Sequence, residues 1–367
     1  ILKKLVNLVN ILMSYMANLK RNKYQNKHTE NLGLAFDLAK INLGSTNENP
    51  SVGCVVEKDG SIISSGYTSL NGRPHAEFNA LNKNLNFKNS SIYITLEPCS
   101  HYGKTPPCTN IIKRKGIKKV FYSIADIDER SNNKAKKIFL NNNISINKSY
   151  LNKKGLNFYK SYYKFKKNQT PIIDAKIALS NDYYTQNAKN RWITNEKSRK
   201  FSHLLRTKYN ALLSTSKSIN RDNSLLNCRI SGLINKSPDL LILDRNLIIK
   251  KNLKIFKVKT KRKIYIYTKK NDKGKIKWLK KNKVRVILMN NFDSKKDFVK
   301  IFKSFSKLKY SRIFVETGLT FLNVLLKNNL LDNIYIFKTK FNLGKNGFNN
   351  SSNKFIKKIK LKEKLRI

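Results

Sequence analysis

The stretch Thr95-Leu-Glu-Pro-Cys-Ser-His-Tyr-Gly-Lys-Thr-Pro-Pro-Cys108, with His75-Ala-Glu77 upstream, decides how the first half of this chain folds. The two segments supply one imidazole, two thiols and one free carboxylate. A zinc ion held by three protein ligands keeps a fourth position for water and lowers the pKa of that water to about 7. The expected zinc ligands are His75, Cys99 and Cys108. Glu77 is then the expected general acid and base of a hydrolytic deamination.

The residues around these candidates predict the local structure that would place them. Ile92-Tyr-Ile-Thr-Leu96 alternates β-branched, aromatic and apolar residues and predicts a strand. Residues 108–115 predict a helix, because two prolines precede this run and Gly116 follows it. Cys108 would lie in the first turn, where the helix dipole favours a thiolate. Residues 76–81 predict a second helix, which begins at the other part of the metal site.

A closed zinc site that only holds loops together is the alternative. Such sites normally use four protein ligands and short Cys-x-x-Cys knuckles. Here eight residues separate Cys99 from Cys108, and no fourth Cys or His stands at ligand spacing. His101 is the nearest candidate, but it falls between the cysteines in a loop rich in Gly and Pro. The pattern therefore favours an open, catalytic site.

The rest of the first half predicts a three-layer α/β sandwich. Residues 30–43 carry apolar side chains at the spacing of a helix with one buried stripe. Residues 52–57 and 61–66 flank Lys58-Asp-Gly60, which is a hairpin signal. A further strand is expected at residues 119–124, so that helices cross between strands. The metal would lie between the two helix starts.

The second half repeats strand-like runs that alternate with helical segments and predict a mostly parallel sheet. The expected strands are Ile172–Ala178, Ala211–Ser214, Leu240–Leu243, Lys263–Thr268, Val284–Met289, Ile313–Glu316 and Asn333–Phe337. Gly318 joins one strand to a helix expected over residues 319–331, which would let a phosphate approach the helix N-terminus. The chain has no Gly-x-Gly-x-x-Gly fingerprint, so a standard Rossmann dinucleotide site is not supported.

Composition limits the possible classes of protein. A chain of 367 residues suggests two domains. The formal charge of +54 would normally suggest nucleic acid or a membrane surface as the partner. Lys, Asn and Ile are abundant together along the whole chain, which the codon bias of an A+T-rich genome explains without a partner. We expect no dedicated nucleic-acid partner, no membrane association and, with four scattered cysteines, a reducing cytoplasm.

The zinc segments closely resemble the bifunctional riboflavin-biosynthesis deaminase/reductase family. Asn49-Pro-Ser-Val-Gly53 belongs to the resemblance, as does the long spacing from Cys99 to Cys108, where other deaminases carry Pro-Cys-x-x-Cys. The resemblance implies a cytidine-deaminase-like α/β/α domain that hydrolyses the 2-amino group of 2,5-diamino-6-(5-phosphoribosylamino)pyrimidin-4-one. The residues implied at this substrate are Asn49, His101, Lys104 and Asp126.

The second half resembles the reductase domain of the same family, which has a dihydrofolate-reductase-like α/β fold. Lys176-Ile-Ala-Leu-Ser180, Leu204-Leu-Arg206 and Val315-Glu-Thr-Gly318 carry the resemblance. It implies that NADPH reduces the ribosyl group to ribityl. The implied cofactor residues are Leu179, Trp192, Ser218, Asp222, Gly318, Leu319, Thr320, Phe321, Leu322, Asn323 and Val324. The implied substrate residues are Asn190, Arg206, Leu226, Arg229 and Glu316.

Several positions depart from the family pattern and leave alternatives open. Thr68 stands where the family usually has histidine, Tyr183 replaces a glycine, and Leu319 replaces a proline. A deaminase with a degenerate reductase domain is one alternative, and an RNA-directed zinc deaminase is another. We expect a homo-oligomer. The expected domains are an N-terminal extension at 1–28, the zinc-dependent deaminase at 29–150, a linker helix at 151–170 and the reductase at 171–367.

Overall fold

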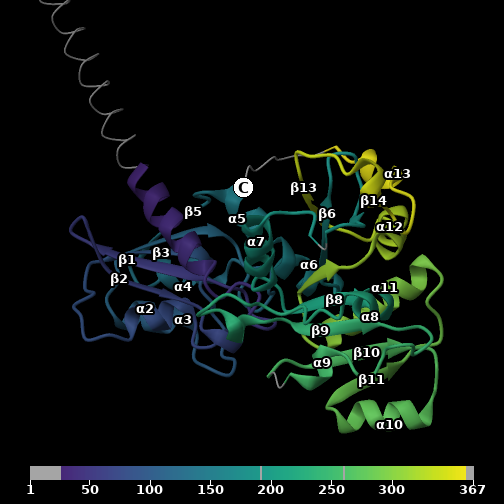
Figure 1. The fold of residues 1–367 in the computed structure, drawn as a ribbon. Helices are drawn as coiled ribbons and strands as arrows, with labels where there is room; N and C mark the ends of the chain where they lie inside the picture. The colour runs from purple at the N-terminus through teal and green to yellow at the C-terminus, as the bar shows by residue number, and fades with distance from the viewer. Residues whose placement is uncertain (1–25, 191, 259–260, 361–367) are drawn as a thin grey trace, which may run out of the picture. The chain divides into compact units, whose positions relative to one another are not determined.

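The computed structural model describes residues 26–190, 192–258 and 261–360 (Figure 1). The chain divides into two compact units between Lys166 and Lys167. Both units combine helices with a sheet, which confirms the predicted pair of α/β domains. Among the described residues, no helix is long and apolar enough to cross a membrane. Most of the N-terminal extension, residues 1–25, lies outside the described residues.

The first unit is built on a five-stranded sheet with the order β2-β1-β3-β4-β5. The strands are β1 (Gly53–Lys58), β2 (Ser61–Tyr67), β3 (Ser91–Leu96), β4 (Lys119–Ile124) and β5 (Ser145–Lys148). β1 is antiparallel to β2 and β3, whereas β3, β4 and β5 are parallel. The predicted hairpin joins β1 to β2, and Asp59 and Gly60 both have positive φ, at 49° and 90°. Two positive φ angles match the twist of the flanking strands.

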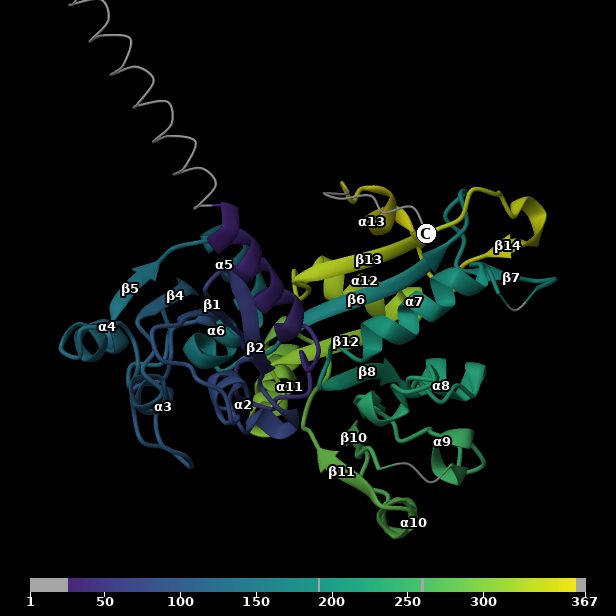
Figure 2. The same ribbon diagram turned by 90° about the vertical axis from the view of Figure 1, so that its left-hand side faces the viewer.

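Helices cover both faces of this sheet and make the three predicted layers (Figure 2). The helices are residues 26–39, α2 (Ala76–Leu81), α3 (Cys108–Arg114), α4 (Lys134–Leu140), α5 (Asn152–Phe158) and α6 (Lys160–Asn168). Two glycines permit the close approach of helices to the sheet. A Cβ on Gly53 would lie 1.8 Å from the carbonyl oxygen of Ala35, and a Cβ on Gly66 would lie 2.4 Å from that of Ala76.

The N-terminal helix differs from its prediction at both ends. It already includes residue 26 and ends at residue 39, not at 43. His28 is buried, its Nδ1 lies 2.8 Å from the hydroxyl of Tyr93, and its ring stacks on Phe121 with 4.2 Å between ring centroids. The end of the predicted extension is therefore part of the first core, because these long-range aromatic contacts continue the helix beyond its local apolar stripe.

The segment expected as a linker helix is instead two helices, α5 and α6, that pack into the first core. Tyr159 and Tyr162 are buried there with the strand residues. The hydroxyl of Tyr159 lies 2.6 Å from Oγ1 of Thr95 and donates to the carbonyl oxygen of Ser51 at 3.1 Å. Lysines interrupt the apolar residues of this segment, so its buried face was not recognised in the sequence.

The second unit has a seven-stranded sheet with the order β11-β10-β9-β8-β12-β6-β13, of which Figure 2 labels every strand except β9. Its strands are β6 (Ile172–Leu179), β8 (Ala211–Thr215), β9 (Asp239–Leu243), β10 (Ile264–Thr268), β11 (Val284–Leu288), β12 (Arg312–Glu316) and β13 (Asn333–Lys338). All neighbouring pairs are parallel, as predicted. A separate antiparallel ribbon pairs β7 (Gln186–Asn187) with β14 (Gly347–Phe348).

Two apolar cores lie on the two faces of this sheet. α11 (Lys295–Lys307), α12 (Leu319–Lys327) and α13 (Lys354–Lys357) contribute to one core. α8 (Ser216–Asp222), α9 (Lys254–Lys257) and α10 (Lys273–Lys281) contribute to the other. α7 (Glu196–Arg206) precedes β8, and the side chain of Asn195 caps its N-terminus by accepting a hydrogen bond from the amide of Ser198. α12 ends four residues earlier than predicted.

Candidate active sites

The three predicted zinc ligands meet in the first unit. His75 is the residue before α2, Cys99 follows β3, and Cys108 is the first residue of α3. Nδ1 of His75 lies 3.6 Å from Sγ of Cys99 and 3.4 Å from Sγ of Cys108. Tetrahedral zinc with ordinary Zn–N and Zn–S bonds would hold these ligand atoms about 3.5 Å apart. The donor set and its spacing therefore fit a zinc ion.

The two thiols form a coupled pair. The Cys108 thiol donates a hydrogen bond to Cys99, and this bond, together with His75 and against the effect of burial, holds the pKa of Cys99 below its ordinary value. The amide of Cys108 adds a hydrogen bond to the same sulfur at 3.2 Å. The same thiol hydrogen bond and burial raise the pKa of Cys108. A divalent cation would bind both sulfurs as thiolates, because it stabilises the deprotonated form.

Glu77 lies in the first turn of α2, two residues after His75, and only 4% of it is exposed. Burial raises the pKa of its carboxyl to about 7, and the neighbouring Cys99 thiolate acts in the same direction. The Cys108 side chain lies beside this carboxylate and acts in the opposite direction on its pKa. A bound cation would lower the pKa again, since it favours the charged form. Glu77 is thus a carboxyl group that is shielded from bulk solvent and lies beside the expected metal.

A cavity of about 460 Å³ opens onto this group of side chains. Besides His75, Glu77 and Cys99, its walls include all four predicted substrate residues, which are Asn49, His101, Lys104 and Asp126. Nδ2 of Asn49 donates to the carbonyl oxygen of Gly72 at 2.9 Å.

Two of the remaining wall residues are held by other side chains. Nδ1 of His101 lies 2.8 Å from Oγ of Ser131. Oδ1 of Asp126 accepts hydrogen bonds from the amide of Asp128 at 3.0 Å and from the hydroxyl of Tyr162 at 2.9 Å. Asp126 therefore shapes the wall through these bonds.

Sequence reasoning missed several charged residues of the same cavity, among them Asp128, Arg130, Lys166 and Arg73. Asp128 forms ion pairs with Arg130 at 2.6 Å and Lys166 at 3.3 Å, and Arg130 holds the pKa of the Asp128 carboxyl well below its usual range. Nη1 of Arg73 donates to Oγ1 of Thr105 at 2.5 Å, beside the loop that carries Lys104. Arg73 could have been noticed because it stands just before Pro74-His75. Lys166 had no local signal.

Thr68 occupies the position at which the family usually has histidine. It lines the same cavity but is almost fully buried, and its Oγ1 accepts a hydrogen bond from the amide of Val52 at 2.9 Å. Thr68 therefore holds the start of β1 and leaves the zinc ligands untouched.

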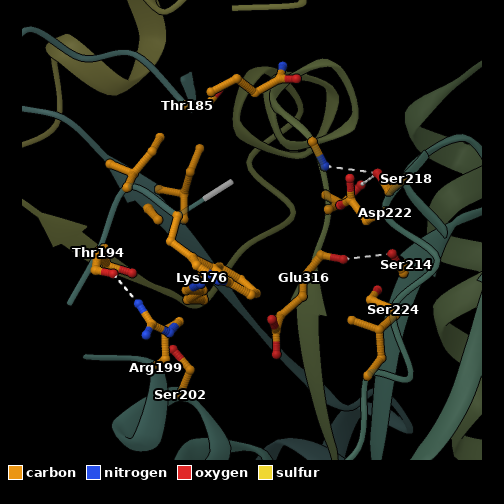
Figure 3. A pocket seen from close by; sticks show the side chains of 18 of the residues that line it. Lys176, Thr185, Thr194, Arg199, Ser202, Ser214, Ser218, Asp222, Ser224 and Glu316 are labelled. Carbon is orange, nitrogen blue, oxygen red and sulfur yellow. Dashed lines mark hydrogen bonds between the residues drawn. The ribbon is translucent and has the colours of Figure 1, made fainter. Parts of the chain in front are cut away.

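The second unit has a cavity of about 500 Å³ at the carboxyl ends of β6, β8 and β12. Ligands of parallel α/β sheets bind at this edge. Lys176 of β6 and Glu316 of β12 are register partners on neighbouring strands, and Figure 3 shows their side chains facing the same space. Ser218 and Asp222 of α8 lie on another wall, where Oγ of Ser218 accepts a hydrogen bond from the amide of Gly318 at 3.1 Å.

A buried ion pair forms the floor of this cavity. Arg206 donates to both carboxylate oxygens of Glu316, at 2.5 and 2.9 Å. Burial by itself would raise the pKa of Glu316, but Arg206 and Lys176 outweigh it and hold that pKa below its ordinary value. Burial lowers the pKa of the Lys176 ammonium, which Glu316 partly offsets. Lys176 is a further site residue that was not predicted, although it begins one of the quoted motifs.

The structure gathers nine of the predicted reductase residues around this cavity. They are Trp192, Arg206, Ser218, Asp222, Leu226, Arg229, Glu316, Gly318 and Leu319. It does not bring Leu179, Asn190, Thr320, Phe321, Leu322, Asn323 or Val324 to the cavity wall. Helical geometry explains why the α12 residues after Leu319 are absent from the wall, since only the start of the helix faces the cavity. Leu322 is buried in the core, and Nδ2 of Asn323 donates to the carbonyl oxygen of Ser352.

Tyr183, which replaces the family glycine, does not enter the cavity. Its φ is +66°, a conformation that glycine adopts more easily. Its ring lies instead beneath the ammonium groups of Lys338 and Lys357, at 4.2 and 5.8 Å. The carbonyl oxygen of Tyr183 accepts a hydrogen bond from Nδ2 of Asn349 at 3.0 Å. The added bulk is therefore accommodated outside the cavity.

Fold and sites together define the class, a zinc-dependent hydrolytic deaminase followed by an α/β reductase. Residues 25–124 match the model of the cytidine and deoxycytidylate deaminase zinc-binding region, and residues 171–365 match that of the RibD C-terminal domain. The chain belongs to the RibD family of riboflavin biosynthesis proteins, and it is a bifunctional deaminase and reductase.

Individual relatives agree with this assignment. The riboflavin biosynthesis protein RibD of Aquifex aeolicus is 32% identical, with 83% of this chain and 84% of the relative covered. A diaminohydroxyphosphoribosylamino-pyrimidine deaminase of Buchnera aphidicola is 37% identical over 35% of this chain and 89% of its own length. A solved deaminase/reductase of Thermotoga maritima has a TM-score of 0.77 at 25% identity, with 89% of this chain and 90% of the other covered.

Proposed function

We propose that the chain catalyses two successive steps of riboflavin synthesis. The first is hydrolysis of the 2-amino group of 2,5-diamino-6-(5-phosphoribosylamino)pyrimidin-4-one, and the second is reduction of the ribosyl group to ribityl. The observation that carries the proposal is the convergence of His75, Cys99, Cys108 and Glu77 at one cavity. The Thermotoga maritima relative is named as a deaminase and reductase of these phosphoribosylamino compounds, which supports the choice of substrate.

In the deaminase cavity, Glu77 moves the protons. Zinc in this site would supply the Lewis-acid chemistry that makes water nucleophilic near neutral pH. Glu77 accepts a proton from the attacking water and passes it to the amino group, which leaves as ammonia while the water oxygen bonds to C2. Its burial beside the metal ligands keeps bulk water from competing for that proton. Lys104 is proposed to face the substrate phosphate as a point charge.

The reduction proposed for the second cavity consumes one proton, and a side chain must donate it. Bound NADPH would supply a hydride for C1 of the sugar, whose bond to the ring oxygen would break. That oxygen must gain a proton to become a hydroxyl group. Lys176 is proposed to supply it, because its ammonium lies on the cavity floor opposite Glu316 and burial makes it more acidic. Arg229 is proposed to bind the phosphate, since a guanidinium offers forked donors.

The degenerate-reductase alternative is not favoured. Tyr183 lies outside the cavity, and Gly318 and Leu319 line it at the start of α12. The RNA-directed alternative is not favoured either, because both family domains match.

We further propose a cytoplasmic homo-oligomer without a dedicated nucleic-acid partner. None of its four cysteines forms a disulfide, which supports a reducing compartment.

A paired assay tests the two activities together. Purified protein given the diaminopyrimidine ribotide and NADPH should release ammonia and oxidise NADPH. Removal of zinc with a chelator should abolish ammonia release, because the remaining side chains cannot activate water. NADPH oxidation should continue when the deaminated intermediate is added directly. Ammonia release that survives complete removal of zinc would contradict the metal role.

Replacement of Lys176 by methionine should lower the rate of NADPH oxidation by about 10²–10⁴-fold, the usual contribution of a positioned proton donor. Methionine keeps most of the side-chain volume between the ring of Phe337 and Glu316. Lys340→Met, on the exposed surface after β13, is the matched control. An unchanged single-turnover rate of NADPH oxidation in Lys176→Met would remove Lys176 from this role, and deaminase activity should be unaffected in both variants.

A further inference from the structure

The loop after α8, residues 223–229, carries two predicted substrate residues, Leu226 and Arg229, to the wall of the reductase cavity. The backbone of this loop is strained at Leu226. Leu226 has a φ of +52°, in the left-handed region that is strained for a leucine. Such a conformation persists only where neighbouring groups enforce it.

Three successive carbonyl groups of this loop point at two buried guanidinium groups. Arg262, just before β10, donates from Nη1 to the carbonyl oxygen of Leu226 at 2.8 Å and from Nη2 to that of Leu225. Arg206 donates from Nη1 to the carbonyl oxygen of Asn227 at 2.6 Å. Arg206 is already neutralised by Glu316, but among the described residues no carboxylate lies within ion-pair distance of Arg262.

Burying Arg262 in this way is energetically costly. Burial lowers the pKa of its guanidinium to about 10, and the charge of Arg206 acts in the same direction. Its Nε, moreover, is a buried donor without a hydrogen-bond partner. A buried charge without an ion-pair partner costs the fold free energy unless its hydrogen bonds offset that cost. The contacts that Arg262 does make are with the substrate loop, although Arg262 itself does not line the cavity.

The far end of the loop is held by an imidazole. Nδ1 of His203 lies 3.0 Å from the carbonyl oxygen of Asn227, and its Nε2 lies 3.3 Å from Nη2 of Arg229. Burial, followed by the charges of Arg206 and Arg229, lowers the pKa of His203 to about 4. The imidazole is therefore neutral, and one of its nitrogens can accept a hydrogen bond from the guanidinium of Arg229. Displacement of the loop at Leu226 would move the backbone of Arg229 away from this acceptor.

We propose that Arg262 is a positioning residue of the reductase, whose two-carbonyl clamp holds residues 225–226 so that Arg229 is aimed into the cavity. The inference rests on the proposed reductase function and adds a residue that acts on substrate affinity through the loop. Arg262 would act on binding and not on the chemical step, since the proposed proton donor Lys176 lies on β6, away from the clamped loop. The expected consequence is a change in KM for the phosphorylated substrate without a matching change in kcat.

The test compares Arg262→Met, Arg262→Lys and the control Arg285→Met, whose guanidinium lies over the ring of Tyr265 on the sheet. Loss of both clamp bonds in Arg262→Met should raise KM for the deaminated ribotide about tenfold or more, because both bonds come from a charged donor and the loop relaxes without them. Arg262→Lys, which keeps the charge but not the fork, should fall between. KM for NADPH, kcat and ammonia release should stay near the wild-type values.

The outcomes separate the inference from the function on which it rests. Wild-type protein that does not oxidise NADPH with this substrate would overturn the reductase function itself. A wild type that is active, with Arg262→Met unchanged in KM, would overturn the positioning role. A fall in kcat and melting temperature at constant KM would also overturn it, because that pattern indicates a merely structural residue. Arg285→Met should behave as wild type throughout.

Discussion

Replacement of Glu77 by glutamine should abolish ammonia release while zinc stays bound. Glutamine has the size and hydrogen-bonding shape of the carboxyl group but cannot accept and return a proton, so the rate should fall by about 10³–10⁴-fold. Glu77 is not among the three side chains that meet at ligand distance, and the metal content should therefore be unchanged. Ammonia release and zinc per chain, measured on the same preparation, check both expectations.

Glu30→Gln provides a matched control, because it removes one carboxylate from an exposed position of the N-terminal helix in the same unit. It should retain full activity. NADPH oxidation with the deaminated intermediate should be normal in both variants, since that cavity is formed by the second unit alone. Retained ammonia release in Glu77→Gln would remove Glu77 from its role, and loss of zinc would instead make it a structural partner of the metal ligands.

The second large effect concerns the buried pair in the reductase cavity. Arg206→Met should destabilise the second unit by about 3–5 kcal/mol and abolish NADPH oxidation, because Glu316 would keep a buried charge without its partner. In wild type the pKa of Glu316 is below its ordinary value of 4.5, so the pair stabilises the fold above that pH. In Arg206→Met, burial would raise the pKa of Glu316 above 4.5. The loss of folding stability caused by its buried charge should therefore be present above pH 4.5 and vanish below it.

Denaturant unfolding of the two units at several pH values measures this effect. The double variant Arg206→Met/Glu316→Gln should regain most of the lost stability, because no charge remains buried, yet it should stay inactive. Arg245→Met breaks an exposed ion pair with Asp293 in the same unit and should cost about 1 kcal/mol or less. An equal loss in the Arg206 and Arg245 variants would contradict the view that burial makes the Arg206 pair important.

The metal site was largely accessible from sequence because its parts are local. The strand at β3, the prolines before α3 and the position of His75 before α2 each follow from neighbouring residues, and together they fix where three ligand atoms emerge. The parallel direction of the strands in the second sheet could be predicted for a similar reason, since each strand and helix has its own apolar period. Local periodicity cannot show which distant segments share a wall.

The sequence by itself thus determined the two α/β domains, the His75, Cys99 and Cys108 set and the strand-turn-helix unit around Gly318. Only the tertiary structure decided that α5 and α6 belong to the first core, that Lys166 joins Asp128 at the deaminase cavity, and that α12 presents only its first turn to the reductase cavity. It also placed Arg262 beneath a loop 36 residues earlier in the chain. Side-chain direction and long-range contact depend on how layers pack, and no local pattern encodes that packing.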